Sequence, residues 1–166
     1  MRHSALYAGT FDPITLGHWD LMERASKIFD RVIIAVVRRP KKTTLFTARE
    51  RTEMVKKSVV GLPNVEVTIF GGLLVDYARQ RKIHVLVRGL RAYSDFEYEF
   101  QMALTNRKIA PEIETLFLMP KETYSYLSSS VVREVAELGG DLKDFVPACI
   151  VPYVKRYLGT RRRIAR

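Results

Sequence analysis

The sequence predicts one α/β domain in which a five-stranded parallel sheet carries helices on both faces. Short apolar runs alternate along the chain with segments whose apolar residues recur at helical spacing, and this alternation is typical of parallel α/β sheets. The run at 32–37 is apolar throughout, as expected of a central strand that is covered on both sides. A length of 166 residues, 47% of them hydrophobic and 28% charged, suits a single domain with a sizeable core.

The first strand-to-helix junction favours an anion. A strand over about 4–8 stops at Gly9, and a helix is expected over about 17–29. Free backbone N–H groups and the positive end of the helix dipole make such a junction suitable for a phosphate. His18 stands in the first helical turn, where cations are unfavourable, and its placement there suggests chemistry on a phosphoryl group. An ordinary turn with a surface histidine is the alternative, because neither common glycine-rich phosphate motif is present.

The remaining elements follow from the same criteria, with turn and capping residues marking their ends. Strands are expected at about 32–37, 65–70, 85–87 and 115–119. Helices are expected at about 47–60, 74–81, 94–109, 128–138 and 152–158.

Two segments after the second and third strands are candidates for ligand contact. Arg38–Lys42 places four cations at the carboxyl end of a strand, where ligands bind in open α/β sheets, although a solvated loop is the alternative. Gly71 and Gly72 end the third strand. Leu74, which follows them, is either a core residue or an apolar wall for a substrate arm.

Two further segments are suited to phosphate. Arg88-Gly89-Leu90-Arg91 ends the fourth strand, where guanidinium groups fit phosphate oxygens and Gly89 would let a ligand approach the backbone. Ser128–Ser130 begins a helix that needs only one serine as its N-cap. The others leave hydroxyl and N–H groups for a diphosphate or triphosphate. These segments and the first junction are expected to meet at one edge of the sheet.

The charge and its distribution limit the partners. The formal net charge is +10, and four of those charges come from Arg161, Arg162, Arg163 and Arg166. We therefore expect a domain over 1–158 and a basic C-terminal tail over 159–166. A basic body suits nucleic acid or a polyanionic small substrate. No nucleic-acid partner is expected, because basic and aromatic residues are not interleaved and no DNA- or RNA-binding motif is present.

A cytoplasmic location is expected. No apolar run approaches the length of a membrane span, and the N-terminus lacks the apolar region of a signal peptide. The single cysteine, Cys149, excludes an internal disulfide and fits a reducing compartment. Histidine and cysteine residues show no metal-ligand spacing.

The residue types favour nucleotidyl or phosphoryl transfer. Nothing in the sequence resembles a Ser-His-Asp set, a pair of catalytic carboxylates or a Schiff-base lysine site. Positioning and charge stabilisation would then carry the reaction. A phosphate monoester that attacks is mostly a dianion at neutral pH, since its second pKa is ~6, and it needs no general base.

Several motifs together resemble one enzyme family. Gly9–Pro13 followed by Thr15-Leu16-Gly17-His18 resembles the (His/Thr)-x-Gly-His signature of a nucleotidyltransferase superfamily. Matches to one member family follow in order and spacing at Arg88–Arg91, Asp95–Glu99, Asn106-Arg107 and Ser128–Ser130. Over about residues 3–158 the sequence is identified as a member of the bacterial phosphopantetheine adenylyltransferase family, with a Rossmann-like fold.

The resemblance implies transfer of AMP from ATP to 4'-phosphopantetheine, which gives dephospho-coenzyme A and pyrophosphate. The catalytic residues that it implies are His18, Thr10, Lys42 and Arg91. The ATP-binding residues that it implies are Thr10, Phe11, His18, Gly89, Leu90, Arg91, Glu99, Tyr124, Ser125, Tyr126, Leu127, Ser128, Ser129 and Ser130. The substrate-binding residues that it implies are Thr10, Lys42, Leu74, Arg88, Met102 and Asn106.

The resemblance further implies Mg²⁺ as the cofactor, a homohexamer, and coenzyme A as a feedback inhibitor. Other interpretations stay open from the residues alone. Spacing does not choose the base or the acceptor, so another adenylyl- or cytidylyltransferase, acting on nicotinate mononucleotide or glycerol 3-phosphate, is the nearest alternative. A basic nucleic-acid-binding module is the alternative from a different class.

Overall fold

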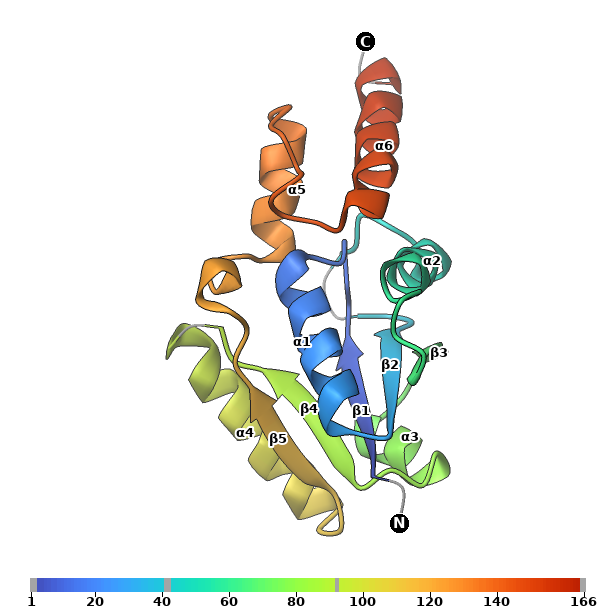
Figure 1. Cartoon of the computed structure of the whole chain (residues 1–166), viewed down its shortest axis with the longest axis vertical. Coiled ribbons are helices and arrows are strands. Elements are labelled where there is room, and N and C mark those ends of the chain that lie inside the picture. Colours follow the sequence, from blue (N-terminus) through green and yellow to red (C-terminus); the bar gives the residue numbers. More distant parts are fainter. Residues whose placement is uncertain (1–2, 41–42, 92, 165–166) are drawn as a thin grey trace.

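One parallel sheet of five strands forms the centre of the molecule (Figure 1). The computed structural model describes residues 3–40, 43–91 and 93–164, and no side chains at 93–95 or 158–164. The strands are β1 (Ser4–Gly9), β2 (Arg31–Val37), β3 (Val65–Phe70), β4 (Val85–Gly89) and β5 (Glu114–Leu118). Their order is β3-β2-β1-β4-β5, and every neighbouring pair is parallel. The predicted fold class is confirmed.

In the part of the chain that the structure describes, six α-helices and two short 3-10 helices connect or extend the strands. The α-helices are α1 (Leu16–Ile28), α2 (Ala48–Ser58), α3 (Leu74–Gln80), α4 (Tyr93–Ile109), α5 (Ser129–Glu137) and α6 (Val151–Ile164). The 3-10 helices are η1 (Glu122–Tyr124) and η2 (Ala148–Ile150). In Figure 1, α5 and α6 stand beyond the carboxyl ends of β1 and β2. None of the helices in the described ranges combines the length and the apolar character that a bilayer crossing requires.

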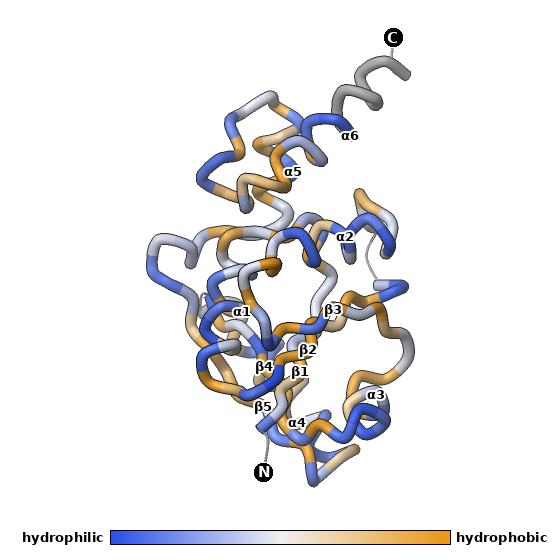
Figure 2. The backbone as a smooth tube through the Cα atoms, turned by 45° about the vertical axis from the view of Figure 1, so that its right-hand side comes forward, coloured by the Kyte–Doolittle hydropathy of each residue, from blue (hydrophilic) through white to orange (hydrophobic). Residues whose placement is uncertain are grey.

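Alternation along the strands divides the core between the two faces of the sheet. In β1, Ala5 and Tyr7 belong to one apolar cluster, and Leu6 and Ala8 belong to the other. Helices α1, α2, α5 and α6 contribute to the first cluster, whereas α3 and the segment that follows α4, with Ala110 and Ile113, contribute to the second. Figure 2 shows hydrophobic residues along β1 and β2, and their assignment to the two clusters makes both sides of these central strands apolar. This arrangement confirms helices on both faces.

Capping residues fix the starts of two helices. Thr47 accepts a hydrogen bond from the Glu50 backbone at 3.3 Å, and the Glu50 carboxylate accepts one from the Thr47 N–H at 2.8 Å. The capping box predicted for α2 is therefore confirmed. In α1 the N-cap is Thr15 and the helix begins at Leu16, one residue before its predicted start.

The last helix is longer than predicted. We expected it to end near residue 158, but α6 continues to Ile164 and crosses the predicted boundary between domain and tail. Arginine is a good helix former, and cations are favoured near a helix C-terminus, so the arginine-rich sequence there is compatible with a helix. The division into a domain and a tail stays a prediction.

Candidate active site

The candidate active site lies at the carboxyl edge of the sheet, where the direction of the strand order changes. From β1 the chain first proceeds outward to β2 and β3, and it later returns to place β4 on the other side of β1. Ligands of open α/β sheets bind at such a switch point. Arg88, near the end of β4, bridges the two strands there, because its Nη1 donates to the carbonyl of Ala8 at 2.8 Å.

His18 is held by the cap of its own helix. The Thr15 backbone N–H donates to His18 Nδ1 at 3.1 Å, and the His18 N–H donates to Thr15 Oγ1 at 3.3 Å. Because Nδ1 is an acceptor in this capping box, the proton of the neutral ring lies on Nε2. The ring also packs edge-on against Phe11, with centroids 5.2 Å apart. His18 is thus oriented to act as a donor through Nε2.

The loop before α1 depends on the packing of Phe11. The Phe11 side chain is only 2% exposed, and its φ of 51° lies in the left-handed region. A Cβ atom on Gly9 would lie 2.7 Å from the Phe11 ring, so Gly9 must be a glycine to admit the ring. With its ring in the core, Phe11 could contact ATP through its backbone.

Arg88 and Glu99 are paired with each other. Arg88 donates from Nε to Glu99 at 2.7 Å and from Nη2 at 2.6 Å, so the pair is bidentate. Burial acts to lower the pKa of Arg88, but the hydrogen bond and charge of Glu99 outweigh it and raise that pKa. Three of the five N–H bonds of Arg88 are used by Glu99 and Ala8, which leaves two for a ligand.

The structure corrects the reason given for Gly89. We expected this glycine to let a ligand approach the backbone. Instead, a Cβ atom there would lie 2.4 Å from Leu21 Cδ1, so α1 occupies the space beside Gly89. Its neighbour Leu90 extends the sheet, since the Leu90 N–H donates to the carbonyl of Leu118 at 3.0 Å. Contact of these two residues with ATP stays a prediction.

Tyr7 is buried within reach of the charges of Arg88 and Arg91. The ionisation of its phenol gives a test of this burial. Burial raises the pKa of the Tyr7 phenol to about 12, with smaller opposing effects from Arg88 and Arg91. A phenol ionises at about pH 10 in an unfolded chain, so its stabilising contribution is complete below that pH and is lost as pH rises through about 12.

We expect urea unfolding between pH 10 and 12 to show this loss. The free energy of unfolding should fall by about 2–3 kcal/mol more in the unaltered protein than in Tyr7→Phe, which has no phenol to ionise. Equal losses in the two proteins would contradict the prediction.

The serine-rich segment reaches both other segments through hydrogen bonds. Arg91 Nη1 donates to the carbonyl of Leu127 at 2.6 Å, which ties the end of β4 to the turn before α5. Ser129 Oγ donates to the carbonyl of Pro13 at 2.9 Å, which ties α5 to the loop before α1. The three segments predicted to bind phosphate, Gly9–His18, Arg88–Arg91 and Ser128–Ser130, therefore meet at one edge of the sheet.

The three serine hydroxyls are engaged within the protein. Ser128 is the N-cap and accepts the Val131 N–H at 3.1 Å, as one serine was expected to do. Ser129 donates to Pro13, and Ser130 accepts from Arg133 at 3.2 Å. The expectation that two hydroxyls remain uncommitted was wrong, because the Pro13 carbonyl and the Arg133 guanidinium already bind them. Among the described residues, the backbone N–H groups of Ser129 and Ser130 have no hydrogen-bond partner, as is usual in the first turn of a helix.

Three of the predicted substrate-binding residues lie on helices α3 and α4. Leu74 packs partly buried against the second core cluster at the start of α3. Met102 and Asn106 lie one turn apart on α4, and Asn106 is only 6% exposed. Within the described part of the chain, nothing hydrogen-bonds the Asn106 side-chain amide. Lys42 lies outside the described residues.

Around η1, the Tyr124, Ser125 and Tyr126 residues lie between β5 and α5. The Ser125 hydroxyl donates to the carbonyl of Glu122 at 2.8 Å. Tyr126 is exposed, whereas Leu127 is fully buried. The aromatic ring of Tyr126 is therefore available to a ligand, and Leu127 offers its backbone.

Sequence reasoning missed three charged residues that join the loops of the site. Asp12 and Arg51 are each 1% exposed, and Arg133 pairs with Asp12 at 2.8 Å. Arg51 donates to the carbonyls of Thr10, Val37 and Phe46 at 2.6, 2.9 and 3.1 Å. Charged residues in a polar loop and on helices give no sign of burial in the sequence, so only the tertiary structure could identify them.

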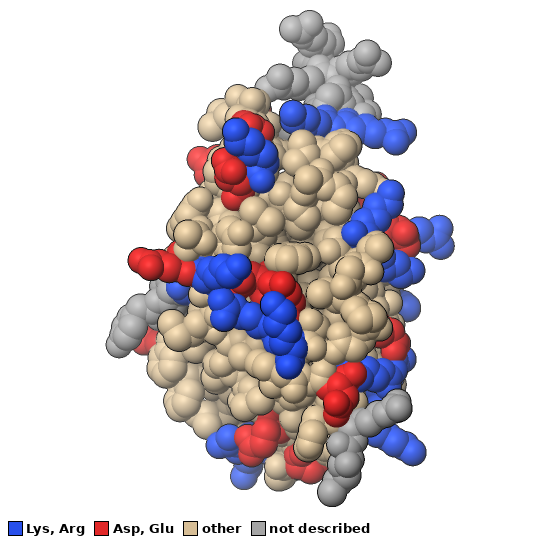
Figure 3. Space-filling view, in the orientation of Figure 1, with Lys and Arg blue, Asp and Glu red and all other residues tan. Residues whose placement is uncertain are grey.

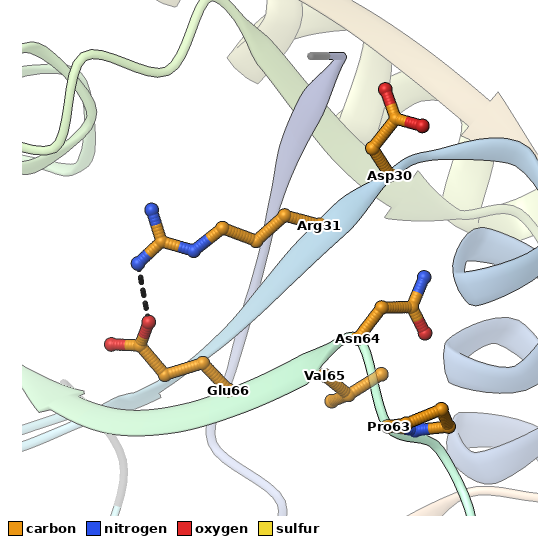
Figure 4. Close-up of a pocket in the computed structure, with 6 residues that line it drawn as sticks. All are labelled: Asp30, Arg31, Pro63, Asn64, Val65 and Glu66. Atoms are coloured by element: carbon orange, nitrogen blue, oxygen red, sulfur yellow. Dashed lines mark hydrogen bonds and ion pairs between the residues drawn. The ribbon is translucent and has the colours of Figure 1, made fainter.

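A separate hollow of about 310 Å³ lies at the opposite edge of the sheet. It is lined by Asp30, Arg31, Pro63, Asn64, Val65 and Glu66 (Figure 4). Arg31 and Glu66 form an ion pair beside it, so their charges offset each other. Because ligands of parallel sheets bind at the carboxyl ends of the strands, we do not assign the active site to this hollow.

Basic and acidic side chains are mixed on the surface of the molecule. On the face in Figure 3, Lys and Arg side chains are interspersed with Asp and Glu and do not form one continuous basic stripe.

Among the described residues, no group of three His, Cys, Asp or Glu side chains could hold a metal ion.

Comparison with known proteins identifies the family. A family model described as cytidylyltransferase-like matches residues 6–135. The phosphopantetheine adenylyltransferase of Methylococcus capsulatus is 58% identical over 147 residues, which cover 89% of this chain and 91% of the relative. The enzyme of the same name from Alkaliphilus metalliredigens is 53% identical, over 88% of this chain and 93% of the relative. The one from Thioalkalivibrio sulfidiphilus is 51% identical, over 96% of this chain and 100% of the relative. The chain belongs to the phosphopantetheine adenylyltransferase family. The family predicted from the sequence motifs is confirmed.

Solved structures support the same fold at much lower identity. The nicotinic acid mononucleotide adenylyltransferase of Plasmodium falciparum, solved with NaAD, has a TM-score of 0.66 and is 15% identical, with 97% of this chain and 96% of that one covered. A candidate nicotinate-nucleotide adenylyltransferase of Vibrio parahaemolyticus has the same TM-score at 21% identity, with 96% and 93% covered. At these identities the likeness shows a Rossmann-like nucleotidyltransferase fold. The phosphopantetheine adenylyltransferase family assignment rests on the closer relatives.

Proposed function

We propose that this protein transfers AMP from ATP to 4'-phosphopantetheine and so forms dephospho-coenzyme A and pyrophosphate in coenzyme A biosynthesis. The single observation that carries this function is 51–58% identity to phosphopantetheine adenylyltransferases over most of the chain. The three predicted phosphate-binding segments meet at the switch point, which agrees with this function. The reaction brings together the three phosphate groups of ATP and the one of phosphopantetheine.

His18 is proposed to stabilise charge on the α-phosphate as that phosphorus becomes five-coordinate. Its Nδ1 already accepts the Thr15 N–H, so the ring serves as a donor through Nε2 and does not act as a base. No base is required, because the attacking phosphate is mostly a dianion at neutral pH. The role of His18 is thus electrostatic.

The acceptor phosphate is proposed to bind near Thr10 and Lys42. Thr10 is half-buried at the end of β1, and its carbonyl is fixed by Arg51 at 2.6 Å. A phosphate held by these residues can be kept in line with the α-phosphorus. Arg88 and Leu74, with Met102 and Asn106, are proposed to seat the pantetheine arm.

The triphosphate is proposed to bind between Arg91 and the start of α5. Arg91 supplies a cation, and the N–H groups of Ser129 and Ser130 lie in the first turn of the helix, where an anion is favoured. Glu99 is proposed to contact the nucleotide as well as Arg88, because each carboxylate oxygen can accept a second hydrogen bond. The segment 124–128 and Phe11 complete the proposed ATP site, together with Gly89 and Leu90.

Mg²⁺ is proposed to arrive with ATP. The described residues offer no cluster of ligands for it, and the buried Asp12 carboxylate is occupied by Arg133 and two backbone amides. Magnesium is commonly bound by substrate phosphates and water with little help from the protein. Bound in this way, it would offset charge on the phosphate oxygens.

A pyrophosphate-release assay tests the function. The protein should release pyrophosphate from ATP with phosphopantetheine and should do so far more slowly with nicotinate mononucleotide or glycerol 3-phosphate. Preference for one of the other two acceptors would overturn the proposed substrate. Release only in the presence of an oligonucleotide would indicate a different class of protein.

A homohexamer is proposed, and exposed apolar side chains on α4 support self-association. Phe96, Phe100 and Leu104 recur every four residues on this helix and are 43%, 46% and 47% exposed. Leu116 on the edge strand β5 is also 46% exposed. Exposed apolar side chains that recur on one helix support, as part of this proposal, an interface with another copy of the chain.

We expect Leu104→Glu to dissociate the assembly, because it would bury a carboxylate in an apolar contact. Val60→Glu, at another exposed apolar position, should leave the assembly unchanged. Sedimentation velocity measures both variants, and an unchanged mass for Leu104→Glu would exclude α4 from the interface. Inhibition by coenzyme A and a cytoplasmic location stay predictions.

A further inference from the structure

Asp12 is a buried carboxylate that joins three parts of the chain. It lies in the loop between β1 and α1 and is 1% exposed. Its oxygens accept the backbone N–H groups of Leu45 at 2.7 Å and Phe46 at 2.9 Å, both in the segment that follows the basic loop. The third partner is Arg133 of α5, whose Nη1 lies 2.8 Å from Oδ2. One carboxylate therefore links the His18 loop, the segment after β2 and the helix of the serines.

Arg133 continues this link to the start of its own helix. Its Nη2 donates to Ser130 Oγ at 3.2 Å, while Nη1 binds Asp12. The planar guanidinium thus spans from the His18 loop to the first turn of α5, where the triphosphate is proposed to bind. Arg133 is three residues from Ser130, one helical turn away, so the contact fixes that turn.

The position of the first turn of α5 matters to the proposed chemistry. Among the described residues, three polar interactions link this turn to the rest of the site: Arg133 with Asp12, Ser129 with Pro13, and Arg91 with Leu127. Only the first of these is an ion pair with a fully buried partner, and it resists displacement because leaving Asp12 unpaired would be unfavourable. Misplacement of a phosphate-binding turn by about 1 Å can cost on the order of 10²-fold in rate.

We propose that Arg133, acting through Asp12 and Ser130, is a positioning residue that holds the start of α5 in register with His18 during adenylyl transfer. The inference rests on the proposed function. It assigns Arg133 no contact with the reacting atoms. Its effect should appear on the nucleotide side of the reaction, because α5 carries the proposed triphosphate site and the pantetheine arm lies against other elements.

The test compares Arg133→Met with a matched control. Arg24→Met also removes a partly exposed arginine from a fully buried aspartate, Asp20, at the same distance of 2.8 Å. Among the described residues, no hydrogen bond or ion pair joins Arg24 to α5. Steady-state kinetics with ATP and phosphopantetheine are measured well below the melting temperature of each variant, together with that temperature and the circular dichroism spectrum.

For Arg133→Met we expect kcat to fall about 10- to 100-fold and the KM for ATP to rise. The KM for phosphopantetheine should stay within about threefold. Arg24→Met should keep kcat within about threefold of the unaltered protein, even if its melting temperature falls as much as that of Arg133→Met. Arg133→Lys keeps the cation but cannot span Asp12 and Ser130 with a planar fork, so it should recover part of kcat and tests the proposal even if Arg133→Met does not fold.

Three results would overturn the inference. The first is a kcat within threefold of the unaltered protein for both Arg133→Met and Arg133→Lys, and the second is an equal loss of kcat in Arg24→Met and Arg133→Met. The third is an equal rise in the KM values for ATP and phosphopantetheine in Arg133→Met. Failure of the unaltered protein to use phosphopantetheine would instead overturn the proposed function. The two failures are therefore distinguishable.

Discussion

Replacing His18 by alanine should lower kcat by about 10²- to 10³-fold while the protein stays folded. An oriented donor that stabilises charge in the transition state is typically worth this much. The capping box with Thr15 presents the ring with Nδ1 occupied and Nε2 as the donor. The fall should appear in kcat, because the proposed interaction strengthens as the α-phosphorus becomes five-coordinate.

The same histidine completes a helix cap, so the alanine variant also loses a structural contact worth about 0.3–1.5 kcal/mol. His18→Gln separates the two effects. Glutamine at this position of a capping box can accept the Thr15 N–H with its side-chain oxygen, which preserves the cap. We expect His18→Gln to unfold like the unaltered protein and to be nearly as inactive as His18→Ala. Activity within a few-fold of the unaltered protein in either variant would remove His18 from the mechanism.

Replacing Arg51 by methionine should lower the free energy of unfolding by about 3–5 kcal/mol. The guanidinium is fully buried and donates to the carbonyls of Thr10, Val37 and Phe46. Each buried carbonyl that loses its partner costs about 1–3 kcal/mol. Burial also lowers the pKa of Arg51, and the nearby Asp12 carboxylate acts in the opposite direction.

Urea unfolding measures the effect of Arg51→Met. Lys27→Met is the control, since Lys27 forms an exposed pair with Glu23 at 3.0 Å and its loss should cost at most about 1 kcal/mol. If Arg51→Met is too unstable to purify, Arg51→Lys should show a smaller loss, because an ammonium cannot reach three carbonyls in one plane. A change below 1 kcal/mol in both Arg51 variants would show that the buried hydrogen bonds do not hold the loops.

The sequence could predict the elements whose signals are local. The all-apolar run of β2 and the Thr47–Glu50 capping box each determine their structure within a few residues, and both are observed. The end of α6 could not be placed, since the arginines after residue 158 suit a helix as well as a solvated tail. Boundaries of this kind depend on weak propensities.

The site could be predicted in part for the same reason. Motifs at the ends of β1 and β4 and at the start of α5 pointed to one edge of the sheet, where they meet. The sequence could not show that Ser129 and Ser130 already have partners, or that Gly89 faces Leu21. Asp12 and Arg51 were missed because their partners, the Arg133 side chain and several backbone groups, lie in distant segments, which no local pattern records.

The central place of β1 has a consequence for synthesis of the chain. This strand pairs with β2 on one side and with β4 on the other, and Ala5 lies opposite Val85 in that second pairing. A ribosome adds about 5–20 residues per second, so one edge of the strand waits several seconds for its neighbour to emerge. During that interval an apolar strand with an unpaired edge is open to association with other nascent chains, and a chaperone that covers it early would protect the yield of folded protein.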